Sequence, residues 1–121
     1  MSGVQTPLVD WWKASKHMPF FIFRGADGPD GGPIRAEIRE AHRAYIRTAT
    51  QNCRVVAGGP LVNDAGDEMF GTLLVLEASD RKAAQQYLQG DPYAEAQLFA
   101  RTELDRWQWG LGDLILPPKG S

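Results

Sequence analysis

The sequence predicts a single α+β domain with the element order strand, helix, strand, strand, helix, strand. Apolar and β-branched runs typical of strands occur at residues 18–24, 53–57 and 69–78, and a last, long strand is expected at 98–109. Two segments between them, residues 33–51 and 80–88, instead repeat their apolar residues at helical spacing. This order is the ferredoxin-like arrangement, in which two helices cover one face of a four-stranded antiparallel sheet.

The first strand follows an N-terminal extension, residues 1–18, and opens the domain that we place at residues 19–110, before a tail at 111–121. Its residues are apolar on both faces, and Pro19 is tolerated because it stands near the start of the strand. The glycine-rich segment 25–32 lacks the lysine and the spacing of a phosphate-binding loop. We therefore expect this segment to be a mobile connector or lid.

The first helix gathers basic side chains along one flank. Pro33 suits its first turn, and we expect the helix to reach about residue 51. Its predicted apolar stripe consists of Ile34, Ile38, Ala41, Tyr45 and Ala49. Arg35, Arg39 and His42 lie beside that stripe, so the helix brings two permanent cations and an imidazole together.

Turn and cap signals divide the rest of the chain. The strand at 53–57 is expected to end at Gly58-Gly59-Pro60, and residues 63–67 form a turn before the strand at 69–78. Asp80 can cap the second helix and Gly90 can end it. Asp91 can then cap a short turn that begins at Pro92, before the last strand.

Both faces of the predicted sheet are apolar, because residues 20–23 and 73–76 are apolar at successive positions. The two helices cover only one face. The sheet of a second copy can cover the other, which predicts a homodimer, with the tryptophan-bearing extension 1–18 as the alternative cover. Trp107 and Trp109 alternate on one face of the last strand and suit either a dimer contact or a pocket wall.

Composition excludes several classes of partner. The 121 residues carry a formal net charge of −2 with no run of like charges, so we expect no nucleic-acid partner. No apolar run is long enough to span a bilayer, and the start of the chain lacks the pattern of a signal peptide. The lone Cys53 cannot form an internal disulfide, and we expect it to be a packed side chain in a cytoplasmic protein.

Metal and cofactor signatures are also missing from the sequence. The two histidines, His17 and His42, show no metal-ligand spacing with one another or with Cys53. No Gly-x-Gly-x-x-Gly motif follows a predicted strand. We expect neither a protein-held metal nor a cofactor.

Residues 19–109 resemble the YCII-related family of small dimeric α+β barrel proteins. The resemblance rests on Arg35 and Arg39 before His42, with Tyr45 after it, on Gly59-Pro60-Leu61, on Gly66 and Gly71, and on Asp91-Pro92-Tyr93. It implies a dimeric barrel of the ferredoxin-like type whose proposed active-site pair matches His42 and Asp91. Some relatives act as dehydrochlorinases on chlorinated aromatics, and the wider superfamily includes lactone isomerases. The extension, the glycine-rich segment and the tryptophan-rich end depart from the family pattern.

These residues fit proton-transfer chemistry. Imidazole takes up and returns a proton near neutral pH, and a carboxylate from Asp91 would fix the tautomer of His42. Arg35 and Arg39 would hold a carboxylate or phenolate. Each residue also has a structural interpretation: a histidine bonded to a carbonyl, an aspartate that only caps a helix, and arginines on a solvated flank.

We therefore expect a cofactor-independent lyase or isomerase that acts on a small aromatic or lactone-like anion, in a pocket between the sheet and the first helix. The chief alternative is a non-catalytic module that binds a small molecule or a larger enzyme. A third interpretation, a structural dimerisation domain, requires the pocket to be filled by side chains.

Overall fold

The computed structural model describes residues 18–112. Its elements are β1 (Phe20–Asp27), α2 (Gly31–Ile46), β2 (Cys53–Val62), β3 (Met69–Ala78), α3 (Arg81–Gln89), α4 (Pro92–Glu95) and β4 (Phe99–Trp107). The predicted order is confirmed, and the short turn after Asp91 is the helix α4. The extension 1–18, apart from Met18, and the tail beyond residue 112 lie outside the described residues.

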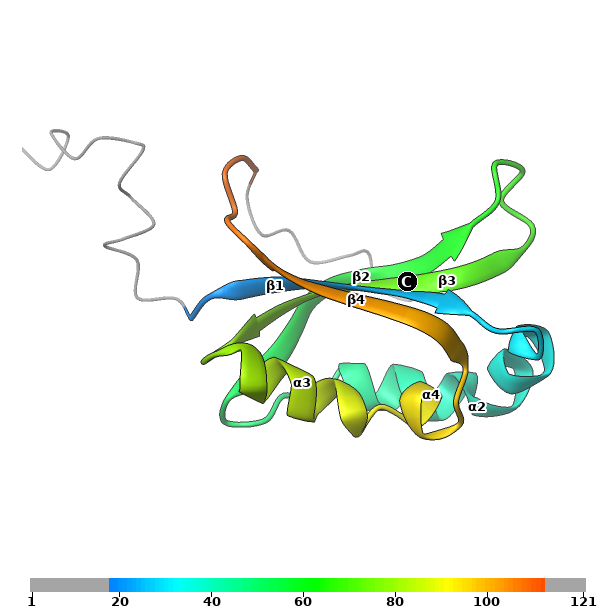
Figure 1. Cartoon of the computed structure of the whole chain (residues 1–121), viewed down its shortest axis with the longest axis horizontal. Helices are drawn as coiled ribbons and strands as arrows, with labels where there is room; N and C mark the ends of the chain where they lie inside the picture. The colour runs from blue at the N-terminus through cyan, green and yellow to red at the C-terminus, as the bar shows by residue number, and fades with distance from the viewer. Residues whose placement is uncertain (1–17, 113–121) are drawn as a thin grey trace, which may run out of the picture.

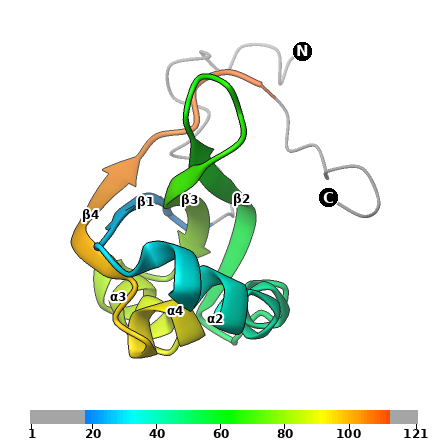
Figure 2. The same ribbon diagram turned by 90° about the vertical axis from the view of Figure 1, so that its right-hand side faces the viewer.

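The strands form one four-stranded antiparallel sheet in the order β2-β3-β1-β4. Figures 1 and 2 show that α2, α3 and α4 all lie on the same side of this sheet. The tip of the β2–β3 hairpin projects away from the layer of helices (Figure 1). The ferredoxin-like α+β fold predicted from the sequence is thus the observed one.

The core lies between the sheet and α3 with the second half of α2. Phe21 and Phe23 of β1 and Leu74 and Leu76 of β3 are almost fully buried there. Side chains alternate between the two faces of a strand, so the same strands also present a second row of side chains to the opposite face. On the helical side, Tyr87 of α3 packs into this core.

The glycine-rich segment is less of a loop than the sequence predicts. β1 continues through Gly25 and Ala26 to Asp27, because these residues pair with both β3 and β4. α2 then begins at Gly31, two residues before Pro33. The expectation of a mobile connector over residues 25–32 is therefore wrong for most of the segment, and only residues 28–30 join the two elements.

β2 also continues past its predicted end and runs through Gly58-Gly59-Pro60 to Val62. Gly58 stands opposite Leu74, and a Cβ atom there would lie only 2.6 Å from Cδ2 of Leu74. The glycine is needed for this close approach rather than for a turn. Pro60 is tolerated because β2 is an edge strand, where a missing N–H group costs no ladder bond on the outer side.

α2 differs from its prediction in both its length and its buried face. The helix ends at Ile46, because the N–H and hydroxyl groups of Thr50 bond to the Cys53 carbonyl and close a turn into β2. Its buried residues are Gly31, Arg35 and His42, whereas Ala41 and Ala49 of the predicted apolar stripe are exposed. Arg35 and His42 of the basic flank are thus buried, while Ile34, Ile38 and Tyr45 of the predicted stripe are half-buried.

The face of the sheet away from the helices carries an aromatic cluster. The rings of Phe20, Trp107 and Trp109 lie 5.0 to 6.4 Å apart, centroid to centroid. Arg54 and the buried Glu77 form an ion pair on the same face. The extension, which the sequence analysis offers as an alternative cover for this face, lies outside the described residues apart from Met18.

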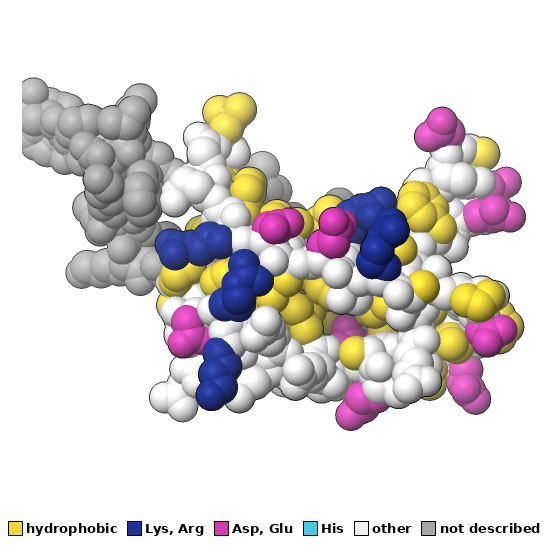
Figure 3. Space-filling model, viewed as in Figure 1, with side chains coloured by type: hydrophobic (Ala, Val, Ile, Leu, Met, Phe, Trp, Pro, Cys, Tyr) yellow, Lys and Arg dark blue, Asp and Glu magenta, His cyan; other side chains and the backbone are white. Residues whose placement is uncertain are grey.

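The surface of the described residues carries both acidic and basic side chains (Figure 3), in keeping with the small net charge of −2. On the face drawn in Figure 3, basic and acidic side chains of the described residues are interspersed, and acidic ones gather at the tip of the β2–β3 hairpin. None of the described helices is both long enough and apolar enough to cross a membrane. Cys53 is free and buried, as expected.

Candidate active site

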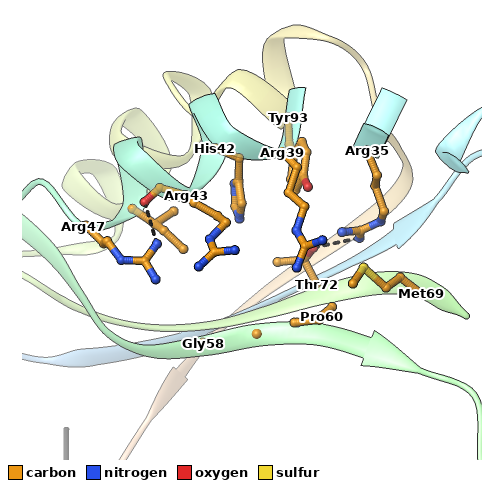
Figure 4. Close-up of a pocket in the computed structure, with 12 residues that line it drawn as sticks. Arg35, Arg39, His42, Arg43, Arg47, Gly58, Pro60, Met69, Thr72 and Tyr93 are labelled. Atoms are coloured by element: carbon orange, nitrogen blue, oxygen red, sulfur yellow. Dashed lines mark hydrogen bonds between the residues drawn. The ribbon is translucent and has the colours of Figure 1, made fainter. Parts of the chain in front are cut away.

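A cavity of about 150 Å³ opens between α2 and the strands β2 and β3. Five basic side chains line it, four of them from α2 and the fifth, Arg47, from the residue that caps its C-terminus; they are Arg35, Arg39, His42, Arg43 and Arg47. Figure 4 shows these side chains extending from α2 toward the strands, where Gly58 and Pro60 form the opposite wall. The cavity lies where the sequence predicts a pocket, between the sheet and the first helix.

His42 and Asp91 are in direct contact. Nδ1 of His42 lies 2.8 Å from Oδ1 and 2.9 Å from Oδ2 of Asp91, and both residues are at least nine-tenths buried. A carboxylate accepts hydrogen bonds, so the proton of the neutral imidazole belongs on Nδ1. Asp91 does not line the cavity whereas His42 does, so the other edge of the ring, with Nε2, faces the cavity.

Asp91 owes its position to the start of α4. Its Oδ1 accepts the backbone N–H of Tyr93 at 2.9 Å, which is the side-chain cap predicted from the Asp-Pro sequence. Pro92 occupies the first turn, where its missing N–H costs nothing. The cap interpretation and the contact with His42 are therefore both true of Asp91, because its carboxylate serves both groups.

Tyr93 holds the plane of the imidazole. Its ring stacks on His42 with centroids 3.9 Å apart and an interplanar angle of 15°. Only 1% of Tyr93 is exposed, yet it lines the cavity. The sequence interpretation gave Tyr93 no role, because an aromatic residue after a capping aspartate carries no local signal of a contact with His42.

Arg35 is held by a carboxylate of its own. Its Nε donates to Oδ2 of Asp27 at 2.7 Å and its Nη2 donates to Oδ1 at 2.9 Å. Nη2 also donates to the Gly71 carbonyl and to Oγ1 of Thr72. Burial by itself lowers the pKa of the Arg35 guanidinium, but the hydrogen bond and charge of Asp27 outweigh it and raise that pKa. The sequence interpretation missed Asp27, which it placed in a mobile loop.

Arg39 differs from Arg35 in having no such partner. Its side chain is exposed, lines the cavity, and has no ion-pair or hydrogen-bond partner among residues 18–112. Arg43 and Arg47 extend the basic row to the end of α2 and its C-cap, where Arg47 donates to the Arg43 carbonyl at 3.0 Å (Figure 4). Asp27 and Asp91 are already paired with Arg35 and His42, and no carboxylate of the described residues lines the cavity. The cavity therefore favours an anionic guest.

The described residues contain no group of three or more His, Cys, Asp or Glu side chains arranged to hold a metal ion. His17, to which the sequence interpretation gave no role, lies outside them. The chemistry that these groups themselves offer is proton transfer at His42 beside a row of guanidinium groups.

Comparison with known proteins agrees with this architecture. The profile of the YCII-related domain matches residues 18–108, most of the chain. The protein belongs to the YCII-related family. No curated protein sequence matches it. The family resemblance carried by the arginine, histidine and Asp-Pro-Tyr residues is thus confirmed.

One solved structure shares the YCII-related fold and has a described activity. It is the 5-chloro-2-hydroxyhydroquinone dehydrochlorinase from Burkholderia phenoliruptrix AC1100, in complex with 2,5-dihydroxybenzoquinone. The TM-score is 0.64 and the sequence identity 27%, and the match covers 74% of this chain and 93% of the other. This relative is a lyase that acts on a chlorinated, hydroxylated aromatic ring, which supports a lyase-type interpretation of the present site.

Proposed function

We propose that this protein is a cofactor-independent lyase or isomerase that moves a proton on a small, aromatic or lactone-like anion. The observation that supports this best is the imidazole of His42, bound by Asp91 on one side and facing a cavity lined by guanidinium groups on the other. A structural dimerisation domain would have this space filled by side chains. The cavity of about 150 Å³ argues against that interpretation.

In the proposed reaction, Nε2 of His42 takes a proton from a C–H or O–H group of the bound molecule. The electron pair left behind moves through the conjugated system. It then either expels a leaving group such as chloride, as in a lyase, or takes up the proton at another atom, as in an isomerase. Asp91 keeps the imidazole oriented and stabilises the imidazolium that forms.

The arginines would bind the negative group of the substrate. Arg39 is the best-placed residue, because its guanidinium lines the cavity and has no partner among the described residues. Arg35 is held by Asp27, so we propose that it contributes its charge and its position at the cavity end rather than a freely moving side chain. The planar, hydroxylated ring bound by the dehydrochlorinase relative is the guide to substrate class.

Chloride release tests this proposal. The protein is incubated with 5-chloro-2-hydroxyhydroquinone and related chlorinated dihydroxybenzenes, and chloride is measured against the His42→Gln variant. We expect turnover by the unaltered protein and its loss by about a hundredfold or more in the variant. A matched control, Arg101→Gln, changes an exposed residue of β4 outside the cavity and should keep the full rate. Turnover that survives removal of His42 refutes the assignment.

A non-catalytic binding module is the second candidate, because an anion-binding cavity serves such a module equally well. That function predicts binding of a hydroxylated aromatic anion without any conversion, and with His42 dispensable. Mass spectrometry of the ligand after prolonged incubation separates the two candidates.

We also propose a homodimer, formed through the sheet face that carries Phe20, Trp107 and Trp109. Analytical ultracentrifugation should give twice the mass of the chain, and Trp107→Glu should shift it toward the monomer. A monomer at all concentrations contradicts this proposal. The cytoplasmic location expected from the lone cysteine stays a prediction.

A further inference from the structure

We infer that the hydroxyl group of Tyr93 is a second ligand-contacting group of the cavity, which donates a hydrogen bond to the substrate oxygen where negative charge develops. This inference rests on the proposed function, because it assigns a partner for the charge that His42 creates. It adds a residue to which neither the sequence interpretation nor the family comparison gave a role.

The phenol of Tyr93 lies between the two groups that define the cavity. Its ring stacks on His42 at 3.9 Å, and Cζ of Arg35 lies 5.1 Å from the ring centroid. Tyr93 is the second residue of α4, and its backbone N–H is bound by the Asp91 carboxylate. The ring is therefore held in place from three directions and is not free to turn toward solvent.

The hydroxyl group of Tyr93 makes no hydrogen bond among residues 18–112. The hydrogen bonds of Arg35 go to Asp27, Gly71 and Thr72, and its guanidinium lies beside the ring of Tyr93, 5.1 Å from the ring centroid. The O–H group of this buried residue is therefore a donor that still needs an acceptor. Since Tyr93 lines the cavity, an acceptor atom on a bound molecule would satisfy this donor.

Two carboxylates position the groups on either side of Tyr93. Asp91 fixes the tautomer of His42, and Asp27 holds Arg35, whose guanidinium lies beside the ring of Tyr93. When His42 removes a proton, the electron pair moves onto an oxygen of the substrate. The Tyr93 donor and the Arg39 cation then stabilise that oxygen without any covalent change to the protein.

The ionisation state of Tyr93 agrees with a donor role. Burial raises the pKa of its phenol above the ordinary value of 10.0, and the charges of Arg35 and Arg39 oppose that rise without cancelling it. The phenol is accordingly protonated at neutral pH and has a proton to donate.

4-Nitrophenol is a suitable probe, because the colour of its phenolate reports ionisation and binding in one titration. We expect the unaltered protein to bind the phenolate and to lower the pH at which the bound probe ionises. Tyr93→Phe keeps the ring that stacks on His42 and removes only the donor. Its dissociation constant should rise about tenfold to a hundredfold, as expected for a hydrogen bond to a charged group.

Tyr45→Phe is the matched control, because the Tyr45 hydroxyl donates to the Tyr87 carbonyl and does not line the cavity. A second arm replaces all three tyrosines by 3-fluorotyrosine, whose more acidic hydroxyl should tighten phenolate binding. Binding that depends on Arg39 but is unchanged by Tyr93→Phe or by fluorination overturns this inference and leaves the proposed function standing. No binding by the unaltered protein contradicts both.

Discussion

Asp91 binds His42 through both oxygens of its carboxylate, with Nδ1 of the imidazole 2.8 Å from one oxygen and 2.9 Å from the other. The two residues are 49 positions apart in the chain and come together where α2 packs against α4. Because Oδ1 also caps α4, the same side chain fixes a helix start and an imidazole orientation. Capping and orientation can be separated by substitution.

Asp91→Asn should separate them. Asparagine is as good a helix cap as aspartate, so the melting temperature should change little. The negative charge that stabilises the imidazolium is lost, and turnover should fall on the order of 10²-fold to 10⁴-fold. Steady-state kinetics and thermal unfolding of the same preparation check both halves. An undiminished rate would show that Asp91 is only a cap.

Arg39→Gln should weaken anion binding with little effect on folding. Its guanidinium has no ion-pair partner among residues 18–112, so its removal leaves no buried charge behind. Loss of a charged donor to an anionic ligand should raise the dissociation constant about tenfold to a hundredfold. Calorimetric titration with 4-nitrophenolate measures the effect, and Arg101→Gln is the control. Equal affinities in the two variants would place the anion elsewhere.

Asp27→Ala should destabilise the fold, because it strands the guanidinium of Arg35, which is only 7% exposed. Removing one partner of a buried ion pair costs about 3 to 5 kcal/mol. Urea unfolding should show this loss, whereas Asp30→Ala should not, because Asp30 makes no side-chain cap hydrogen bond at the start of α2. Equal stabilities of the two variants would mean that the Arg35–Asp27 pair contributes nothing to the fold.

Cys53 should make stability fall at alkaline pH. Burial raises the pKa of its thiol from an ordinary value of 9.0 to about 11. Between these values the unfolded chain loses the proton before the folded chain does, so the free energy of unfolding decreases as pH rises from 9.0 to about 11. The loss from this group is on the order of 2 kcal/mol.

Comparison with a Cys53→Ala variant isolates the contribution of the thiol to the free energy of unfolding. The buried tyrosines Tyr87 and Tyr93 destabilise both proteins at alkaline pH and so cancel in the comparison. Urea unfolding is measured for each protein at several pH values. The stability difference between them should shrink as pH passes from 9.0 to about 11. A difference that is independent of pH would mean that the thiol does not titrate differently in the folded chain.

The fold was predictable because its elements differ in hydrophobic period, and period is read directly from the sequence. The strand ends were not. Gly58-Gly59-Pro60 has the composition of a turn, but in the structure Gly58 accommodates Leu74 and Pro60 lies on an edge strand. Both the close approach of Leu74 and the edge position of β2 depend on how the strands are arranged in the sheet. The sequence of one segment does not reveal that arrangement.

The site was predictable only in part. His42 and its neighbouring arginines share a helix flank, so their spacing brings them together, and the family resemblance added Asp91. Asp27 and Tyr93 were missed because a carboxylate in a glycine-rich segment and an aromatic after a cap are ordinary locally. Their partners, Arg35 and His42, come from another element, and tertiary packing alone supplies the contact. These contacts with other elements also explain why residues of the basic flank of α2 are buried.

The central claim is that the imidazole nitrogen facing the cavity is the basic one. ¹⁵N NMR of the imidazole tests this claim directly. The sequence has two histidines, so a His17→Gln variant leaves His42 as the single source of the imidazole signals. We expect the neutral ring to carry its proton on Nδ1, with an unprotonated Nε2 whose signal shifts when 4-nitrophenol is added. A proton on Nε2 in the neutral ring, or an Nε2 signal indifferent to the added phenol, would contradict the account.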